Sequence, residues 1–368
     1  MLNYERMAIE IESPEQMGYS NVKYNLTESS FRDVRFQDLK LDLSQLILCY
    51  GDHLGHLELR RWIANDYGVK PENILLTPGA APALFIVATS LLSQSDRILV
   101  VFPNYGTNLE TPRAMGVGID RHEVSFENQW AIDVEALLKQ IKPNTKLVSI
   151  THPHNPTGTV IPYGTLTRLI RECEERKIYL LVDETYRDMD FGNKLPAAVS
   201  QSECVITVSS LSKTYGLPGI RMGWLATRNQ KLFETFLAAK EQILITGSML
   251  DEEVAFQYVR RQQELLPQIR SQILKHQAIV RDWLKGESRL ECVDPKAGVV
   301  CFPRFKTLPE QKWDAFYTIL NRDYGVYVGP GHWFMMEKRY FRLGFGWPTT
   351  DELEQGLAGI SKTLDQLS

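Results

Sequence analysis

Short apolar runs alternate along the chain with longer stretches in which apolar residues recur every three or four positions. The short runs predict buried strands, and the longer stretches predict helices with one apolar face. Such alternation is typical of an α/β fold in which a mostly parallel sheet lies between two helical layers. We expect strands at 98–101, 147–150, 179–182 and 205–208, and helices at 84–92, 134–141 and 166–175.

The pattern changes in the last third of the chain. A long helix near 231–243 is expected to lead out of the first domain, and the chain then reads as helical from about 252 to 291. Strand-like alternation returns at 298–302 and 340–345. We therefore predict an N-terminal arm at 1–44, a large domain at 45–245 and a smaller α+β domain at 246–368.

Composition narrows the classes of function. With 368 residues, 43% of them hydrophobic, the chain can form a large domain and a smaller one. A net charge of −4 gives no basic surface for nucleic acid. There is no apolar run of roughly 18 residues that would predict a membrane span, and the N-terminus lacks a basic-then-apolar signal. We expect a cytoplasmic protein with no membrane partner.

The cysteines and histidines do not predict a metal site. Five cysteines are scattered and never spaced as Cys-x-x-Cys, and seven histidines form no ligand pattern. We expect the cysteines to be reduced core residues.

A lysine in a Ser/Gly-rich loop is the first candidate for chemistry. Lys213 follows the strand predicted at 205–208 and can form a Schiff base with a carbonyl. Ser210 and Ser212 offer hydroxyl donors, and Arg221 offers a planar, permanently charged fork that suits a phosphate. Taken alone, the segment is equally consistent with a polar loop that carries a surface arginine.

Two upstream segments favour a site at the end of the sheet. The strand at 179–182 runs into Asp183, and ends of parallel strands host sites in α/β sheets. A buried carboxylate stays ionised there if a cation faces it, such as a protonated pyridine nitrogen; the alternative is an aspartate that caps the next helix. Asn155 lies in the turn sequence Asn-Pro-Thr-Gly and could donate to a ring oxygen.

Together these segments resemble the fold type I enzymes that use pyridoxal 5′-phosphate (PLP), specifically the class I/II aminotransferase superfamily. The resemblance implies that PLP is the cofactor and that Lys213 binds it covalently. It also implies that Asp183 pairs with the pyridine nitrogen, and that Asn155 and Tyr186 bond the phenolic oxygen. The family's small domain combines the C-terminal portion of the chain with the N-terminal arm.

The resemblance extends to the phosphate and to the α-carboxylate of a substrate. It implies that Tyr105 stacks on the pyridine ring and that Arg342, in an alternating strand, grips the substrate carboxylate. Tyr50 matches a tyrosine that reaches the phosphate of a partner subunit, so a homodimer with shared active sites is implied. Ala81 lacks the side-chain donor of many relatives, so its contact is through the backbone. The implied phosphate contacts are Gly79, Ala80, Ala81, Ser210 and Arg221.

The N-terminal segment departs from ordinary aminotransferases. The chain has Leu-Thr-Glu-Ser-Ser at 26–30 where those enzymes usually carry a Gly-x-Pro signature. This run is similar to the hydroxyarginine cyclases that form capreomycidine or enduracididine, which remove water and close a cyclic guanidine. A β-hydroxyl gives the capreomycidine ring and a γ-hydroxyl the enduracididine ring. Glu28 favours the γ-hydroxy substrate.

A guanidinium side chain needs carboxylates, and several lie in segments near the expected pocket. We predict substrate contacts from Glu28, Glu10 and Asp52, with Glu12 nearby. No arginine occurs at 229–258, where relatives specific for aspartate carry one, so a dicarboxylate substrate is disfavoured. Two alternatives stay open. Glu28 could be a capping or solvated residue, and Glu10 and Glu12 could belong to an amphipathic edge strand.

Three hypotheses follow. The first is a PLP-dependent cyclodehydratase that acts on a hydroxylated arginine, preferably γ-hydroxy-L-arginine. The second is an aminotransferase or lyase for a cationic or neutral amino acid. The third is a regulatory or structural protein that keeps the fold without catalysis, which the intact set of cofactor positions disfavours.

Overall fold

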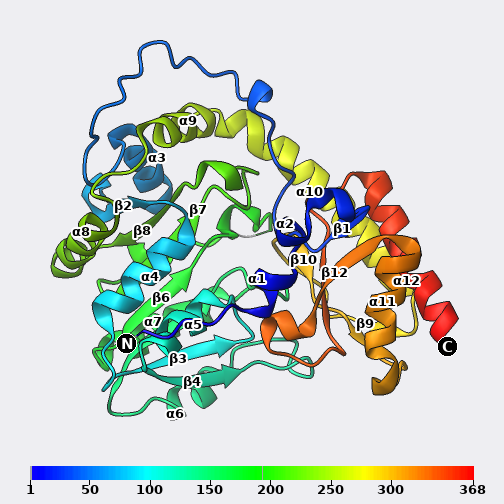
Figure 1. Cartoon of the computed structure of the whole chain (residues 1–368). Helices are drawn as coiled ribbons and strands as arrows, with labels where there is room; N and C mark the ends of the chain where they lie inside the picture. Colours follow the sequence, from blue (N-terminus) through cyan, green and yellow to red (C-terminus); the bar gives the residue numbers. More distant parts are fainter. Residues whose placement is uncertain (1, 193) are drawn as a thin grey trace.

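The computed structural model describes residues 2–192 and 194–368, and a seven-stranded sheet forms its centre (Figure 1). The strand order is β2-β8-β7-β6-β5-β3-β4, and in this sheet β8 alone runs opposite to the other six strands. This confirms the predicted mostly parallel α/β sheet. The strands are β2 (Ile74–Thr77), β3 (Arg97–Phe102), β4 (Gly118–Glu123), β5 (Thr145–Thr151), β6 (Tyr179–Asp183), β7 (Val205–Ser210) and β8 (Gly223–Thr227).

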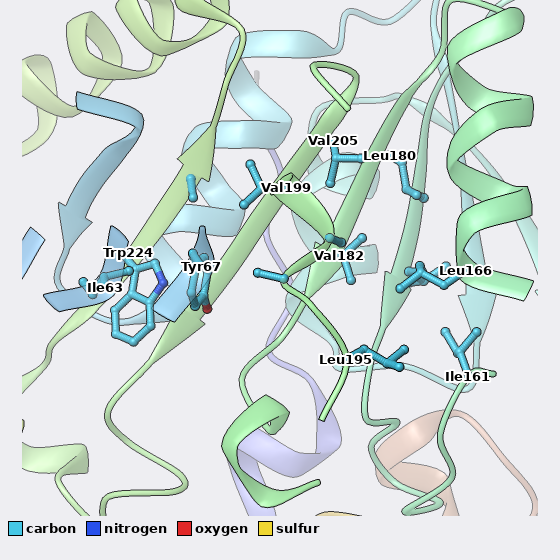
Figure 2. Close-up of a cluster of buried hydrophobic side chains, with 14 of the residues drawn as sticks. Ile63, Tyr67, Ile161, Leu166, Leu180, Val182, Leu195, Val199, Val205 and Trp224 are labelled. Carbon is cyan, nitrogen blue, oxygen red and sulfur yellow. The ribbon is translucent and has the colours of Figure 1, made fainter. Parts of the chain in front are cut away.

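Helices cover both faces of the large sheet. Alternate residues of β6 divide between two cores: Leu180 and Val182 face one, and Leu181 faces the other. Figure 2 shows Leu180 and Val182 on the side of Leu166, a residue of α7. The first core is covered by α3 (Leu57–Tyr67), α6 (Val134–Lys139), α7 (Tyr163–Glu175) and α9 (Met249–Val259), and the second by α4 (Ala80–Leu91), α5 (Thr107–Ala114) and α8 (Gln230–Leu244).

A smaller sheet joins the two ends of the chain. Its order is β1-β12-β13-β10, and β1 pairs in parallel with β12, with Tyr24 opposite Val326. A separate core packs this sheet against three helices. The elements are β1 (Tyr24–Leu26), β10 (Val300–Cys301), β12 (Val326–Pro330), β13 (Phe341–Gly344), α10 (Gln262–Gly286), α11 (Trp313–Tyr324) and α12 (Thr350–Leu367), and beside them lies the pair β9 (Leu290–Glu291) and β11 (Arg304–Phe305).

The structure of the N-terminal segment excludes one of the open alternatives. Residues 8–12 form the short helix α1 (Ala8–Glu12), not an edge strand, and α2 (Pro14–Met17) follows directly. The Glu10 carboxylate accepts the N–H of Met7 at 3.0 Å, which caps the first turn of α1. The alternation of isoleucine and glutamate is therefore a feature of a helix too short to show a helical period.

Most predicted elements are found with their ends moved by a few residues. The single helical stretch expected from 252 to 291 was wrong: α9 ends at Val259, α10 begins at Gln262, and Leu290 already lies in β9. The strand expected at 298–302 shortens to β10. Strand β4 was not predicted because its sequence, Gly-Ile-Asp-Arg-His-Glu, is mostly polar.

The cysteines are all free thiols, but they are not all in the core. Cys173 and Cys301 are buried, whereas Cys49 is exposed on the surface. Among the helices in the described part of the chain, none has both the length and the apolar character needed to cross a membrane.

Candidate active site

A cavity of about 330 Å³ lies at the carboxyl ends of three adjacent strands. Thr151 ends β5, Asp183 ends β6 and Ser210 ends β7, and all three line the cavity. The carboxyl ends of parallel strands meet at one edge of a sheet, so their polar terminal residues are brought together. The start of α4, the small sheet and the two N-terminal helices complete the walls.

Lys213 enters the cavity from the loop after β7. Its side chain is partly buried, and its backbone carbonyl accepts the N–H of Phe31 at 2.8 Å. The loop turns back at Gly216, which has a φ of +62° and lies against the carbonyl of Arg32, where a Cβ would collide. This turn presents the lysine beside the end of β6, so Lys213 and Asp183 share one cavity.

Asp183 is a buried carboxylate. One of its oxygens accepts the Thr185 N–H at 3.0 Å and the Thr185 hydroxyl at 2.6 Å. Burial raises the pKa of Asp183 above its ordinary value, although Thr185 and the charge of Lys213 act against the rise. A cation in the cavity, such as a protonated pyridine nitrogen, would favour the ionised carboxylate. The buried acid therefore fits the ring of PLP.

The N-terminus of α4 is open toward the cavity. The N-cap residue Gly79 has a φ of +98° and supplies no side-chain cap, which leaves backbone N–H groups for an anion. The guanidinium of Arg221 donates to the carbonyls of Pro218 at 2.8 Å and Pro78 at 3.3 Å. A Cβ on Gly79 would lie 2.5 Å from Arg221 Nη2, so glycine lets the guanidinium approach the helix.

The residues around the N-terminus of α4 fit a phosphate group. Ala80, Ala81, Ser210, Ser212 and Arg221 all line the cavity, and Gly79 adjoins it. They combine backbone N–H groups, hydroxyls and one exposed guanidinium, which are the donors a phosphate requires.

Arg342 of β13 is buried in the part of the cavity wall that the small sheet forms. Its Nη1 donates to Asn155 Oδ1 at 3.2 Å and its Nη2 to the carbonyl of Thr27 at 2.6 Å. Its Nε is buried and has no hydrogen-bond partner among the described residues. Phe334 lies under the guanidinium at 5.0 Å. Because a buried guanidinium N–H without an acceptor is unfavourable, this wall is suited to a carboxylate ligand.

Two tyrosines lie between these walls. Tyr186 is buried, and burial raises its pKa to about 12, so it stays a neutral hydroxyl donor. Tyr105 lines the cavity and is partly buried. Its backbone N–H donates to Asn104 Oδ1 at 2.7 Å, and the same oxygen accepts the Thr151 hydroxyl at 3.0 Å. Asn104 thus couples the Tyr105 loop to the end of β5.

A buried histidine fixes the turn that carries Asn155. His154 Nε2 donates to the carbonyl of Pro103 at 2.8 Å, and its Nδ1 accepts from the Thr157 hydroxyl at 2.7 Å. Burial lowers the pKa of His154 to about 4. The neutral ring therefore holds the Asn155 turn against the loop that leads to Tyr105.

The low pKa of His154 has a consequence for stability. The His154 ring takes up a proton near pH 6.5 in the unfolded chain but only near pH 4 in the folded chain. The contribution of the neutral ring to folding stability is therefore complete above pH 6.5 and is lost as the pH falls toward 4. The loss is at most about 3 kcal/mol. We expect His154→Gln to remove this part of the pH slope in urea unfolding measured from pH 7 to 4.

Comparison of the variant with the parent isolates the histidine. Burial raises the pKa of Glu184 to about 7, so that residue contributes a slope of opposite sign, and it is present in both proteins. Equal pH slopes in parent and variant would contradict the assignment to His154.

Carboxylates line the outer part of the cavity. Glu28 is partly buried, and its Oε1 accepts from the Asn25 amide at 3.4 Å and the Tyr19 hydroxyl at 3.5 Å. Glu10 of α1 and Glu15 of α2 line the same cavity. Burial together with Glu28 and Glu15 raises the pKa of Tyr19 above its ordinary value. The outer wall is thus acidic, while Arg342 gives the inner wall a positive charge.

Two predicted residues lie outside the cavity of their own chain. Asp52 pairs with Arg60 at 2.9 Å and accepts the Leu54 N–H at 2.8 Å. It therefore does not reach a substrate in this chain's cavity. Tyr50 is 82% exposed on the same loop, and its predicted contact with a partner subunit stays a prediction.

Several lining residues were not singled out from the sequence. Glu15 follows a Ser-Pro pair, which marks a helix start but not a site. Trp333 lies in a one-turn helix whose place is set by the small sheet. Neither had a sequence signal. The other lining residues that were not predicted as contacts include Ile9, Ser13, Pro14, Thr27, Ser29, Thr151, Thr185 and Pro218.

Known proteins are similar to this chain in sequence and in fold. The family described as aminotransferase class I and II matches residues 18–360. Capreomycidine synthase from Streptomyces vinaceus is 29% identical over 358 residues, which cover 94% of this chain and 91% of that protein. A PLP-dependent aminotransferase structure from Streptococcus suis 89-1591 is 28% identical, with a TM-score of 0.92, and covers 100% of this chain and 99% of that one.

A further structure supports the fold. The PLP-dependent cyclase OrfR has a TM-score of 0.90 at 23% identity, and the match covers 100% of this chain and 99% of the other. Proteins of the family typically act on small amino acids and often form dimers. The predicted cofactor and fold type are confirmed. The chain therefore belongs to the class I and II aminotransferase family and depends on pyridoxal 5′-phosphate.

Proposed function

We propose that the protein is a cyclodehydratase that converts a hydroxylated arginine, preferably γ-hydroxy-L-arginine, into a cyclic guanidine amino acid. The γ-hydroxy substrate would give enduracididine and the β-hydroxy isomer capreomycidine. The observation that carries the proposal is the charge of the cavity lining: the exposed or partly buried Glu10, Glu15 and Glu28 line the same cavity as the buried Arg342. An amino acid with a carboxylate at one end and a guanidinium at the other complements both walls.

The residues that would hold the cofactor are those of the inner cavity. Lys213 would bond its aldehyde carbon, Asp183 would pair with its ring nitrogen, and Asn155 and Tyr186 would bond its phenolic oxygen. Bound PLP supplies an electron sink that makes the Cα–H of the substrate acidic. The phosphate would lie among Gly79, Ala80, Ala81, Ser210 and Arg221, and Tyr105 would stack on the ring.

The chain's own groups would orient the substrate and move its protons. Arg342 binds the substrate's α-carboxylate through its unpartnered Nε, and Asn155 holds the Arg342 guanidinium in place. Lys213 Nζ, released from the cofactor, takes the Cα proton and, for a γ-hydroxyl, a second proton from Cβ. Glu28 orients the substrate guanidinium, whose high pKa keeps it protonated until attack.

The overall conversion needs no oxidant. The C–O bond of the side-chain hydroxyl breaks and the oxygen leaves as water, with a proton from Lys213. A guanidine nitrogen forms a bond to the same carbon and releases one proton. This proton and any proton still held by Lys213 return to Cα and, for the γ-hydroxy substrate, to Cβ, so each carbon regains the hydrogen that it lost. One water is lost, and substrate and product have the same oxidation level.

We also propose a homodimer. Phe36, Ile47, Leu48 and Tyr50 are 73%, 72%, 78% and 82% exposed in one N-terminal segment. Large apolar side chains gathered in this way favour burial against another chain. In the dimer, Tyr50 would approach the phosphate of the partner's cofactor, and Asp52 would lie beside that shared edge.

An aminotransferase for a cationic amino acid is the second candidate. The same acidic wall would bind arginine or lysine without a hydroxyl group, and the Streptococcus suis relative is a PLP-dependent aminotransferase. The inner cavity serves both reactions, because the fold hosts many chemistries.

Substrate assays distinguish the two reactions. We expect holoenzyme to convert γ-hydroxyarginine, and less efficiently β-hydroxyarginine, into a product that has lost one water, without consumption of a keto acid. Mass spectrometry with and without pyruvate measures both outcomes. Transfer of the amino group to pyruvate would contradict the cyclase proposal and favour the aminotransferase. Absence of turnover for every amino acid would favour the non-catalytic hypothesis.

Glu28→Gln tests the acidic wall. We expect kcat/KM for the cationic substrate to fall roughly ten- to one-hundredfold, because a partly buried charge partner is lost, while values for neutral amino acids change little. Glu58→Gln is a suitable control, because Glu58 lies exposed on α3 and pairs with Arg61 away from the cavity. Equal losses for cationic and neutral substrates would argue against a guanidinium contact.

A further inference from the structure

The N-terminal strap, residues 3–17, crosses from the large sheet's helices to the small sheet (Figure 1). At its start, the Glu5 N–H donates to Glu110 Oε1 at 2.7 Å, and Arg113 donates to the carbonyl of Asn3 at 2.6 Å. Glu110 and Arg113 belong to α5, next to the large sheet. One end of the strap is therefore fixed to the large domain.

The middle of the strap forms part of the cavity wall. Ile9 and Glu10 of α1, and Pro14 and Glu15 of α2, line the cavity. The two helices have five and four residues, and α1 has no buried residue. Helices this short are not stable in isolation. The placement of Glu10 and Glu15 over the cavity therefore depends on contacts made elsewhere in the strap.

Glu12 makes those contacts at the junction of α1 and α2. Its Oε2 accepts from Trp333 Nε1 at 2.7 Å and from His332 Nε2 at 2.7 Å. Its backbone carbonyl accepts from the Tyr327 hydroxyl at 2.8 Å. One residue thus ties the strap to three side chains of the small domain, although Glu12 itself does not line the cavity.

The same carboxylate holds a second lining residue, Trp333. Trp333 lines the cavity and lies over Gly329, where a Cβ would be 3.0 Å from the indole ring and 3.4 Å from Arg342 Cβ. The hydrogen bond from its indole N–H to Glu12 sets the ring beside Arg342. Glu12 therefore connects the acidic outer wall to the wall that carries the arginine.

We propose that Glu12 is a positioning residue that latches the N-terminal strap and so holds Glu10 and Glu15 over the substrate's side chain. The latch itself follows from the contacts of Glu12; its effect on cationic substrates rests on the proposed function. Glu12→Gln keeps the size of the side chain but removes the charge that strengthens both ring N–H bonds. Trp333→Phe removes one of the two donors and keeps an aromatic ring.

Hydrogen exchange in the holoenzyme tests the latch. We expect the backbone amides of residues 8–17, other than Pro14, to exchange roughly tenfold faster in Glu12→Gln and also faster in Trp333→Phe. The amides of the large sheet should exchange as in the parent. In the control Glu58→Gln these amides should exchange as in the parent. Unchanged exchange at 8–17 in both latch variants would overturn the proposal, and thermal unfolding of each variant verifies that it is folded.

Kinetics separate positioning from a purely structural role. For a cationic substrate, we expect Glu12→Gln to raise KM roughly three- to tenfold with kcat altered less than about twofold, because the strap carries binding groups and not the base. A fall in kcat with unchanged KM would overturn the positioning role. If the parent enzyme shows no preference for cationic amino acids, the proposed function fails, and the exchange measurement still judges the latch by itself.

Discussion

Replacement of Lys213 by alanine is expected to lower kcat at least about 10³-fold, the largest effect of any single substitution in this chain. The alanine variant loses both the amine that bonds the cofactor and the base that takes the Cα proton. Cofactor retained without the covalent bond would dissociate on dialysis, whereas the parent keeps it. Single-turnover kinetics and the visible absorption of the dialysed protein measure the two losses.

Lys231→Ala is a matched control for this experiment. Lys231 is exposed at the start of α8 and does not line the cavity. Circular dichroism verifies that both variants are folded. If Lys213→Ala kept the absorption band and the turnover of the parent, the entire interpretation of the inner cavity would be wrong.

Asp183→Asn is expected to lower kcat by about 10²- to 10³-fold while the cofactor still binds. The amide has nearly the same shape and can still accept the two hydrogen bonds from Thr185. It carries no charge, so it cannot hold the ring nitrogen of the cofactor in its protonated form. The electron sink is then weaker, and removal of the Cα proton slows.

The measurement compares kcat with the Kd of the cofactor. A large fall in kcat with a change in Kd of about tenfold or less would support an electronic role for Asp183. A variant with kcat within about threefold of the parent would contradict that role. Loss of cofactor affinity alone would assign Asp183 to binding and not to catalysis.

The inner cavity could be predicted from the sequence because its signals are local. Asp183 directly follows one apolar run and Lys213 lies in the loop after the next one, and the carboxyl ends of parallel strands meet at one edge. The glycine before α4 marks a helix start, and Arg342 lies in a strand with regular alternation. Each residue's position depends on its own short segment and on one general rule of sheet topology.

The outer cavity could not be predicted in this way. Glu15 and Trp333 reach the cavity through contacts that join residues more than 300 positions apart, as in the bond between Glu12 and Trp333. The short helix α1 has no apolar face from which a period could be read, which is why its sequence left an edge strand open as an alternative. The carboxylate of Asp52 is bound by Arg60, eight residues along, outside the cavity of its own chain, and its contact with a substrate stays a prediction.

The covalent bond between Lys213 and the cofactor is the claim on which the catalytic account depends. Reduction of the holoenzyme with borohydride, followed by proteolysis and peptide mass spectrometry, tests it most directly. We predict that the pyridoxyl group is recovered on Lys213, in the peptide that contains it, and that no other lysine carries the group. Recovery on a different lysine, or an active enzyme that borohydride leaves unlabelled, would contradict the account.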